Sequence, residues 1–408
     1  MTERLYYSDS YLREFEARIV EKVFLEGRPG VILDRTAFYP ASGGQPHDTG
    51  RLECLPVIEV IEREDKAVVH ITAAEISASL GKKVCGEIDW ARRFDHMQQH
   101  TGQHILSQAF LSLFEAKTVS FHLGEEVSTI DIDRAPLSLE ELEEAEEAAN
   151  AIVFEDRPVR ASFLSEEELA RLPLRKMPAV EGPVRLVIIE DFDHSPCGGT
   201  HCRHTGEVGL IAIGKVERRG DQTRLEFRCG RRALADYRRK NRAVNELAGS
   251  FSVGDWELPQ AVARLREQEE AQRRALHSAM EKLLDYEAAR LVAGAEDGDG
   301  FRLVQAIFQP GSTEEALPWD AERVRHLALR IVEHPSCVAL LGLRGDKARL
   351  TFARSKDLDF DMAALLREVS PLIGGGGGGQ PYLAQGGGAR TEGLEEALEK
   401  ARKILTGK

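Results

Sequence analysis

Two short stretches of this 408-residue chain each carry a pair of metal-ligand residues, and they lie about a hundred residues apart. His100 and His104 occur in "QQHTGQHILS", and Cys197 and His201 occur in "SPCGGTHCRH". Residues i and i+4 share one face of a helix, so the first pair can chelate an ion. Two glycines let the second pair wrap around the same ion. Because three imidazoles and one thiolate suit zinc, the fold is expected to bring these distant segments together.

The spacing alone leaves open which histidines bind, since His96 falls on the same helical face as His100 and His104. The role of the metal is a second open point. Structural zinc sites are rich in cysteine, whereas this set has one cysteine among three histidines. That balance is more typical of zinc sites that perform chemistry.

Length and composition indicate a soluble protein of several domains. A chain of 45.3 kDa predicts about two to four domains. Hydrophobic residues make up 42% and charged residues 30%, and no apolar run is long enough to span a bilayer. The start, "MTERLYYSDSYLREFEARIV", lacks the apolar core of a secretory signal, so we expect a cytoplasmic location. The six scattered cysteines are expected to be thiols rather than a disulfide framework.

The net charge of −14 argues against a generally cationic nucleic-acid-binding protein. The charge is uneven, however, because residues 217–242 contain ten basic and four acidic residues. This patch keeps an RNA partner open, and a solvated helix face is the alternative.

Sequence periodicity predicts an α+β multidomain protein with four parts. They are an N-terminal β-barrel with a glycine-rich loop (residues 1–92), a zinc-containing α+β domain (93–230), a helical hairpin or coiled-coil arm (231–295) and a C-terminal α/β domain (296–408). The arm should hold two helices, at about 231–249 and 259–293. We expect any oligomer to form through the arm or the C-terminal domain.

Three local patterns give more detailed expectations. Asp95 is a candidate N-cap of the histidine-bearing helix. In the acidic helix "SLEELEEAEEAANAIVFEDR", Leu139, Leu142 and Ala145 are expected to pack inward. In "GGGGGGQPYLAQGGG", the apolar residues between two glycine runs favour a docked loop over a flexible linker, with Tyr382 able to stack on an unpaired base.

Several of these motifs together resemble a known family. "HTGQH" and "CGGTH", with "VSFHLGEEVSTIDID" between them and "HTGEVGLIAI" after them, are similar to the editing domain of alanyl-tRNA synthetases and of free-standing AlaX-type editing proteins. "FYPASGGQP" resembles the barrel loop that precedes this domain, and the terminal glycine segment resembles the DHH-associated domain. The resemblance covers nearly the whole chain and implies the long form of the editing protein.

The resemblance implies specific roles for residues. It assigns the zinc ligands to His100, His104, Cys197 and His201, leaving His96, Cys202 and His204 outside the pattern. It places the amino-acid pocket at Thr118, Ser120 and His122, and it implies that the DHH-associated domain binds tRNA. The RNA-binding candidates themselves come from the basic patch (Arg218 and Arg219) and from the glycine segment (Gly376, Gly377, Gly378, Tyr382 and Gly387).

The implied activity is zinc-dependent hydrolysis of mischarged tRNA(Ala), chiefly Ser-tRNA(Ala), with Gly-tRNA(Ala) as a second substrate. A zinc-bound water is the expected nucleophile, no side-chain base is assigned, and a ribose hydroxyl of the substrate could assist instead. The amides of Gly198, Gly199 and Thr200 are candidates to bind substrate at the developing oxyanion, and a plain turn is the alternative.

Other functions remain as alternatives. The chain could be a non-catalytic tRNA-binding module with a structural zinc, or a deacylase acting on another mischarged tRNA such as Ser-tRNA(Thr). About 95 residues precede the histidine helix, too few for an aminoacylation core. No Asp-His-His triplet supports a DHH-type phosphodiesterase.

Overall fold

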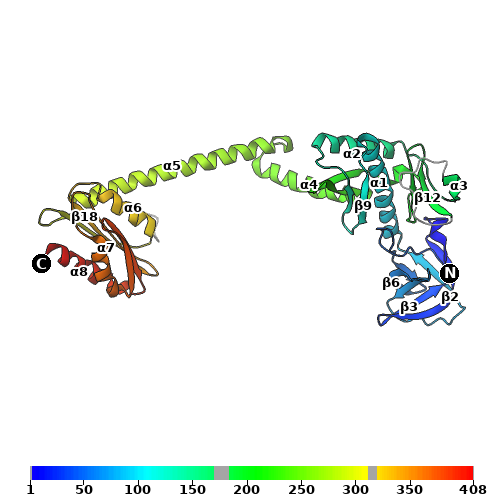
Figure 1. The fold of residues 1–408 in the computed structure, drawn as a ribbon, viewed down its shortest axis with the longest axis horizontal. Helices are drawn as coiled ribbons and strands as arrows, with labels where there is room; N and C mark the ends of the chain where they lie inside the picture. Colours follow the sequence, from blue (N-terminus) through cyan, green and yellow to red (C-terminus); the bar gives the residue numbers. More distant parts are fainter. Residues whose placement is uncertain (1, 170–182, 311–318, 408) are drawn as a thin grey trace. The chain divides into compact units, whose positions relative to one another are not determined.

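The computed structural model describes residues 2–169, 183–310 and 319–407. The chain divides into two compact units, Met1–Ser250 and Phe251–Lys408 (Figure 1). Each unit contains both helices and strands, as expected for an α+β multidomain protein. Among the described residues, no helix has both the length and the apolar character needed to cross a membrane.

The N-terminal part of the first unit is a closed six-stranded barrel, which confirms the predicted β-barrel. Alternate residues of its first strand are buried, among them Phe15, Ala17 and Ile19, so one face of the strand forms the barrel core. Residues 37–49 form the predicted glycine-rich loop. The barrel strands are β2 (Glu14–Leu25), β3 (Arg28–Leu33), β5 (Gly50–Leu52), β6 (Leu55–Glu62), β7 (Val68–Thr72) and β8 (Lys83–Ile88), and a separate parallel pair is β1 (Glu3–Arg4) with β4 (Arg35–Thr36).

The helix that carries both histidines is α1 (Trp90–Phe114). Its N-cap is Asp89, whose side chain accepts a hydrogen bond from the Arg92 amide, so the expectation that Asp95 caps the helix is wrong. Asp95 lies inside α1 and forms an ion pair with Arg232 instead. One turn further along, Arg93 forms a fully buried ion pair with Asp48 of the barrel loop.

The first unit also contains two sheets and two shorter helices. The acidic helix, α2 (Leu139–Phe154), buries Ala145 as predicted, but Leu139 is 67% exposed, so its predicted inward packing is wrong. Leu139 is the first residue after the N-cap Ser138, where the helix does not yet meet the core. The four-stranded sheet runs β14 (Ile211–Arg219), β15 (Gln222–Cys229), β10 (Ser128–Ile132), β9 (Thr118–Leu123), the three-stranded sheet runs β11 (Val159–Leu164), β12 (Val184–Ile189), β13 (Asp193–Pro196), and the helices are α2 (Leu139–Phe154) and α3 (Glu166–Leu169).

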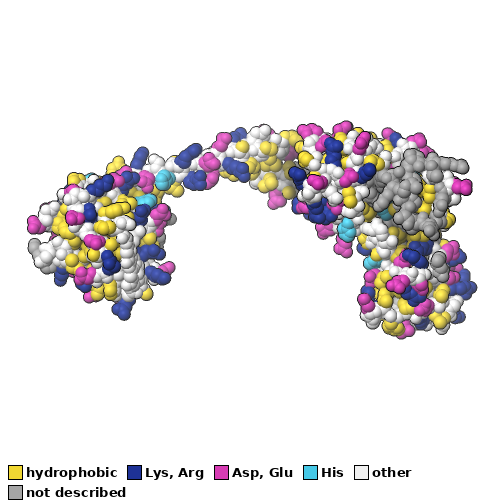
Figure 2. Space-filling view, in the orientation of Figure 1, with side chains coloured by type: hydrophobic (Ala, Val, Ile, Leu, Met, Phe, Trp, Pro, Cys, Tyr) yellow, Lys and Arg dark blue, Asp and Glu magenta, His cyan; other side chains and the backbone are white. Residues whose placement is uncertain are grey.

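Two long helices follow, α4 (Gly230–Phe251) and α5 (Leu258–Ala293), close to the predicted bounds. They fall into different compact units, so a hairpin or coiled-coil arm stays a prediction. Basic and acidic side chains alternate along the surface of α5 (Figure 2). Near its end, Leu284, Ala288 and Val292 are buried in the core of the second unit. The last third of α5 is therefore part of that unit.

The second unit is built on one mixed six-stranded sheet with helices on both faces. Only β17 and β18 pair in parallel among the described strands of this sheet. The strand order is β16 (Glu296–Asp297), β17 (Arg302–Phe308), β18 (Cys337–Arg344), β19 (Ala348–Arg354), β21 (Leu383–Gly388), β20 (Gly375–Gln380), and the helices are α6 (Ala321–Ile331), α7 (Met362–Val369) and α8 (Leu394–Thr406). Short 3-10 helices in the described residues of both units are η1 (Leu5–Tyr7), η2 (Thr205–Val208), η3 (Asp255–Glu257), η4 (Ser370–Ile373) and η5 (Thr391–Gly393).

The glycine segment forms a regular β-hairpin, so the predicted docked loop is wrong. Its two strands lie so close together that a side chain would clash at alternate positions of β20. A Cβ at Gly375 would lie 1.9 Å from the Gly387 oxygen, and one at Gly377 would lie 2.6 Å from the Gln385 oxygen. At Gly376 and Gly378, by contrast, a Cβ would meet no atom within 4 Å. The glycines therefore serve pairing on one face of β20 and leave the other face bare.

Candidate metal centre

The structure brings together the four residues that the sequence singled out. The ligand atoms of His100, His104, Cys197 and His201 all lie within 4.8 Å of one another. The Cys197 Sγ is 3.4 Å from His100 Nε2 and 3.3 Å from His201 Nε2. Helix α1 supplies the first two histidines, and the turn that follows β13 supplies the other two residues.

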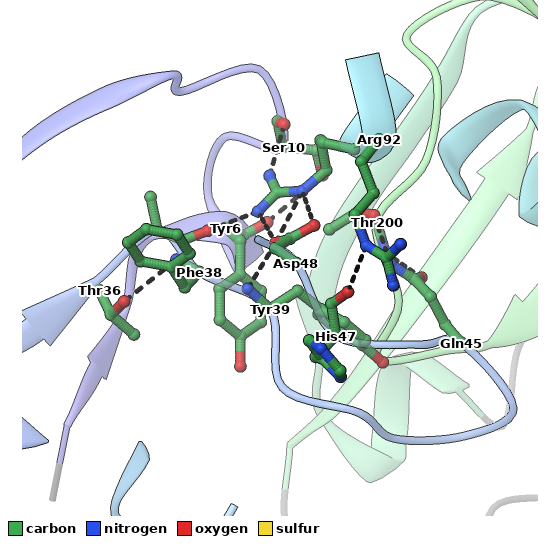
Figure 3. Close-up of polar contacts among 12 residues, drawn as sticks. Tyr6, Ser10, Thr36, Phe38, Tyr39, Gln45, His47, Asp48, Arg92 and Thr200 are labelled. Carbon is green, nitrogen blue, oxygen red and sulfur yellow. Dashed lines mark hydrogen bonds and ion pairs between the residues drawn. The ribbon is translucent and has the colours of Figure 1, made fainter. Parts of the chain in front are cut away.

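The barrel loop reaches into this cluster through one glutamine. The Gln45 Oε1 lies 2.9 Å from His100 Nδ1 and accepts a hydrogen bond from the Thr200 amide at 3.1 Å. Its Nε2 donates to the Thr200 hydroxyl at 2.9 Å (Figure 3). Gln45 is buried and thus ties the loop to α1 and to the turn at the same time.

The other two histidines are held in the same manner. The Nδ1 of His104 is 3.1 Å from an Asp193 carboxylate oxygen, to which Ser195 also donates a hydrogen bond. The Nδ1 of His201 is 3.3 Å from the Thr101 hydroxyl. Because each Nδ1 has a partner, each Nε2 is left for a metal, as in the carboxylate–histidine–zinc arrangement.

The environment shifts the protonation of the cluster. Burial opposes ionisation of the Cys197 thiol, but the neighbouring His100 and His201 rings hold its pKa well below the usual value. Burial lowers the pKa of His201 to about 3. Burial also acts to lower the pKa of His104, yet the hydrogen bonds and charges of Asp193 and Cys197 together outweigh it, so the pKa is raised. A thiolate beside neutral imidazole is the form in which these groups bind metal.

Two features fix the turn that carries Cys197. A Cβ at Gly199 would lie 2.2 Å from the His100 ring, so only glycine fits there. The buried Arg185 donates from Nη1 to the carbonyl oxygens of Cys197 and Gly199, at 2.8 and 2.9 Å. The turn is therefore set by contacts on both sides.

The donor set fits a zinc ion. With bonds of roughly 2.0–2.3 Å, the donors of a tetrahedral zinc site lie about 3.3–3.8 Å apart. The sulfur–nitrogen separations at Cys197 fall at the short end of that range. Three imidazole nitrogens and one sulfur, all held by outer partners, also match the ligands that zinc prefers.

Sequence models of three domains match the chain. They are tRNA synthetases class II (A) at residues 7–92, the Threonyl and Alanyl tRNA synthetase second additional domain at residues 184–225, and the DHHA1 domain at residues 313–407. The alanyl-tRNA editing protein AlaX-L of Pyrococcus horikoshii is 32% identical to this chain over 99% of the chain and 100% of its own length. The chain belongs to this AlaX family of alanyl-tRNA editing proteins.

Alanine–tRNA ligases are also similar to this AlaX-type chain. The ligase of Pyrococcus abyssi is 31% identical over 99% of the chain, which spans 44% of the ligase. A solved structure, the C-Ala domain from Aquifex aeolicus alanyl-tRNA synthetase, is 30% identical, covering 28% of this chain and 98% of that one with a TM-score of 0.25.

The three predicted pocket residues of the AlaX-type chain lie on two faces of β9. The Thr118 hydroxyl donates to Ser107 on α1 at 2.7 Å, on the side of the metal-ligand cluster. The Ser120 hydroxyl donates to Asp131 on β10 at 2.5 Å. Phe121, between Ser120 and His122, stacks on the His100 ring at 5.3 Å between centroids. Since side chains alternate along a strand, Ser120 and His122 lie on the face opposite Phe121.

Two of the three candidate oxyanion donors are already engaged. The Gly199 amide donates to Cys197 Sγ at 3.4 Å, and the Thr200 amide donates to Gln45. Within the described residues, the Gly198 amide has no hydrogen-bond acceptor. Gly198 is also exposed, so it is the candidate of the three that faces solvent.

The RNA-binding candidates lie in both units. Arg218 and Arg219 end β14, where Arg218 donates to the Gly220 oxygen and Arg219 pairs with Glu217. The glycines occupy the β20–β21 hairpin, and Tyr382 sits at its turn with 52% of its side chain exposed.

The residues outside the predicted ligand set take other places. His96 is buried, with a pKa lowered by burial to about 3, and is not part of the cluster. Cys202 is buried, burial raises its pKa, and its amide donates to the Thr101 hydroxyl. His204 lies within reach of Asp156, at 3.8 Å.

Sequence reasoning missed the outer partners of the histidines, which are Gln45, Thr101 and Asp193. Each is a polar residue inside or next to a motif that was noticed: the glycine-rich loop, "HTGQH", and the run before "CGGTH". Of the three, only Asp193 has a signal in the local sequence, because a carboxylate four residues before a ligand cysteine can act as an outer partner of a metal ligand.

Proposed function

We propose that this chain is a zinc-dependent deacylase that hydrolyses the ester bond of mischarged tRNA(Ala), chiefly Ser-tRNA(Ala) and also Gly-tRNA(Ala). Membership of the AlaX family supports the editing role. The observation that carries the proposal is the cluster of His100, His104, Cys197 and His201, with each imidazole held through its Nδ1. A synthetase site for alanine rejects serine poorly, so a second hydrolytic site has a clear use.

In this proposal, the four cluster residues hold zinc. When bound, zinc supplies a Lewis acid that polarises an ester carbonyl or lowers the pKa of a water toward about 7. Gln45, Thr101 and Asp193 keep the three rings oriented, and the Gly198 amide donates to the oxygen on which negative charge develops. We assign no side-chain base.

Serine recognition is proposed to depend on Thr118. Its hydroxyl meets Ser107, which also accepts a hydrogen bond from Gln103, the residue next to His104 on α1. These hydroxyl and amide groups could bind the hydroxyl of a seryl group. Thr118→Val should then cost about 1–3 kcal/mol of transition-state binding for serine and leave glycine nearly unaffected. An unchanged serine-to-glycine rate ratio would place specificity elsewhere.

We propose tRNA contacts at Arg218 and Arg219 in the first unit and on the bare face of the glycine hairpin in the second. Glycine lets an RNA backbone approach the strand without side-chain obstruction, and the exposed Tyr382 offers a ring for stacking. The basic residues of α4 would extend the first surface.

The test is zinc quantification combined with single-turnover deacylation of seryl- and glycyl-tRNA(Ala). His100→Ala and Cys197→Ala should each remove bound zinc and deacylation. Cys202→Ser is the matched control, because this buried thiol lies outside the cluster and should be dispensable for both. Full zinc occupancy in the first two variants would refute the ligand assignment.

The same assay separates the alternatives. An unaltered chain that binds zinc and tRNA but does not deacylate would be a binding module with a structural zinc. Faster hydrolysis of Ser-tRNA(Thr) than of Ser-tRNA(Ala) would show that the substrate assignment is wrong.

A further inference from the structure

A cavity of about 100 Å³ lies beside the metal-ligand cluster, next to His201 and Cys202. One wall is the surface of β11 and β12, and another is the chain from Tyr7 to Tyr11. One water needs roughly 10–15 Å³ of such volume, so the cavity admits a group several times larger. None of the roles proposed above uses this cavity.

Arg185 lines the cavity and is only 7% exposed. A guanidinium has five N–H donors, and Arg185 spends those of Nη1 on the carbonyl oxygens of Cys197 and Gly199. Its Nε has no hydrogen-bond partner among the described residues. A buried guanidinium with an unused donor edge is costly unless something anionic pairs with it.

The rest of the lining is also basic. Arg160 and Arg203 line the same cavity, with side chains 76% and 59% exposed. Arg203 is paired with Asp9, which is the one carboxylate among the described lining residues. Arg160 is 3.9 Å from Glu190, outside the cavity, so this contact is loose. Three guanidinium groups thus face one carboxylate.

We propose that this cavity binds a phosphate group. Arginine forks match phosphate oxygens in pairs, and a small basic recess with one buried arginine suits a compact tetrahedral anion. Arg185 would hold the anion from inside through Nη2, which has no acceptor among the described residues, since its Nε is enclosed, and Arg160 would contact the anion at the mouth. Because Arg185 also holds the turn of Cys197 and Gly199, the anion would stiffen the turn that carries a metal ligand.

The phosphate could come from two sources, inorganic phosphate or the backbone of an RNA. The binding itself does not depend on deacylation. Calorimetric titration of the full, zinc-loaded chain with inorganic phosphate is therefore the first measurement, and saturable binding is expected. A CCA-ended RNA oligonucleotide then identifies the source: competition with phosphate assigns the cavity to RNA, and independent binding assigns it to the free anion.

Two substitutions test the residues. Arg160→Gln should weaken phosphate binding about two- to fivefold, as expected for an exposed charge. Arg185→Lys keeps the charge but loses the fork, and should weaken it about tenfold or more. The matched control is Arg51→Gln, on an exposed barrel position, which should bind as the unaltered chain does. Zinc content is measured in each variant. Within the described part of the chain Arg160 pairs with Glu190 and forms no hydrogen bond or ion pair with the Cys197 turn, so its variant stays informative if Arg185→Lys misfolds.

Absence of phosphate binding in the unaltered chain would overturn the proposal. An equal affinity in the unaltered chain, Arg160→Gln and a zinc-loaded Arg185→Lys would overturn it as well. A chain that binds phosphate at this cavity but leaves seryl-tRNA intact would refute the proposed deacylation and leave the phosphate site standing.

Discussion

Three histidine rings in this protein are oriented by residues that would not touch a metal. Gln45 comes from the barrel loop, Thr101 from α1, and Asp193 from the start of β13. Such outer partners raise the basicity of the ligands and fix which nitrogen faces the ion. Metal affinity should therefore depend on these residues as well as on the four ligands.

The carboxylate of Asp193 gives the sharpest test of this dependence. Asp193→Asn removes the charge beside His104 and should lower zinc affinity about 10- to 100-fold, the usual effect of losing such a partner. Competition with a chelator measures it. Asp191→Asn is the control, because it removes an equal charge two residues away on the exposed turn. Equal affinities in the two variants would contradict the role of Asp193.

Neighbouring glycines of the turn should behave in opposite ways. Gly199→Ala places a methyl group against the His100 ring, so zinc content should fall. Gly198→Ala should keep its zinc, because the nearest atom to its Cβ is the Tyr7 hydroxyl oxygen at 3.7 Å. Metal analysis of the two purified variants compares them directly. If Gly199→Ala were fully loaded, the turn would be more adaptable than its packing indicates.

The two ligand pairs could be recognised from sequence because their spacing and chemistry are local properties, and the family resemblance then chose His100 and His104 over His96. The outer partners of these ligands could not be predicted, since Gln45 contacts Thr200 only after the barrel has packed against the domain that carries the metal-ligand cluster. The same reason explains the pocket residues. The register of β9 against β10, with an irregularity between Asp131 and Ile132, decides that Thr118 faces α1 while Ser120 does not.

Among the elements, the β20–β21 hairpin shows how glycine acts through pairing. Gly377→Ala would place a methyl group 2.6 Å from the Gln385 oxygen and should destabilise the second unit by about 1–3 kcal/mol. Gly378→Ala is the matched control, since its Cβ would meet nothing within 4 Å. Thermal melting compares the two. Gly378→Ala should instead weaken tRNA binding if the bare face contacts RNA, and unchanged affinity would argue against that contact.

Element types were more predictable from sequence than element ends or pairing. Alternating residues such as Phe15, Ala17 and Ile19 reveal a barrel strand because the period of two survives in the sequence. The start of α1 is harder to predict, because aspartate is a favourable N-cap at either Asp89 or Asp95 and the structure uses Asp89. Six glycines give no period at all, so their strand could not be recognised.

For the whole molecule, the boundary of the two units defines where the chain can be divided. A chain ending after Ser252 keeps all residues of the metal cluster and should retain zinc and deacylation. It loses the second unit, so the KM for tRNA should rise with little change in the rate at saturation. Steady-state kinetics on seryl-tRNA(Ala) would show this, and an unchanged KM would mean that the second unit does not bind tRNA.

The cut belongs there rather than after α5, because Leu284, Ala288 and Val292 are buried in the second unit. A chain ending at Ala293 would expose these residues and should aggregate more readily. Light scattering of the two truncated chains at equal concentration checks this, and equal solubility would mean that α5 is stable alone.

The hydrogen bonds of Gln45 also bear on the order in which the metal-ligand cluster is completed during synthesis of the protein. A ribosome releases the N-terminal segments first, so the barrel loop and then the histidine helix emerge before the turn of Cys197 and His201. Until that turn arrives, Gln45 lacks Thr200 and the helix offers only two of the four donors. A nascent chain that stalls before Ser195 therefore contains all residues of the barrel but only two of the four metal ligands. The metal can be bound tightly only after the last third of the first unit has been synthesised.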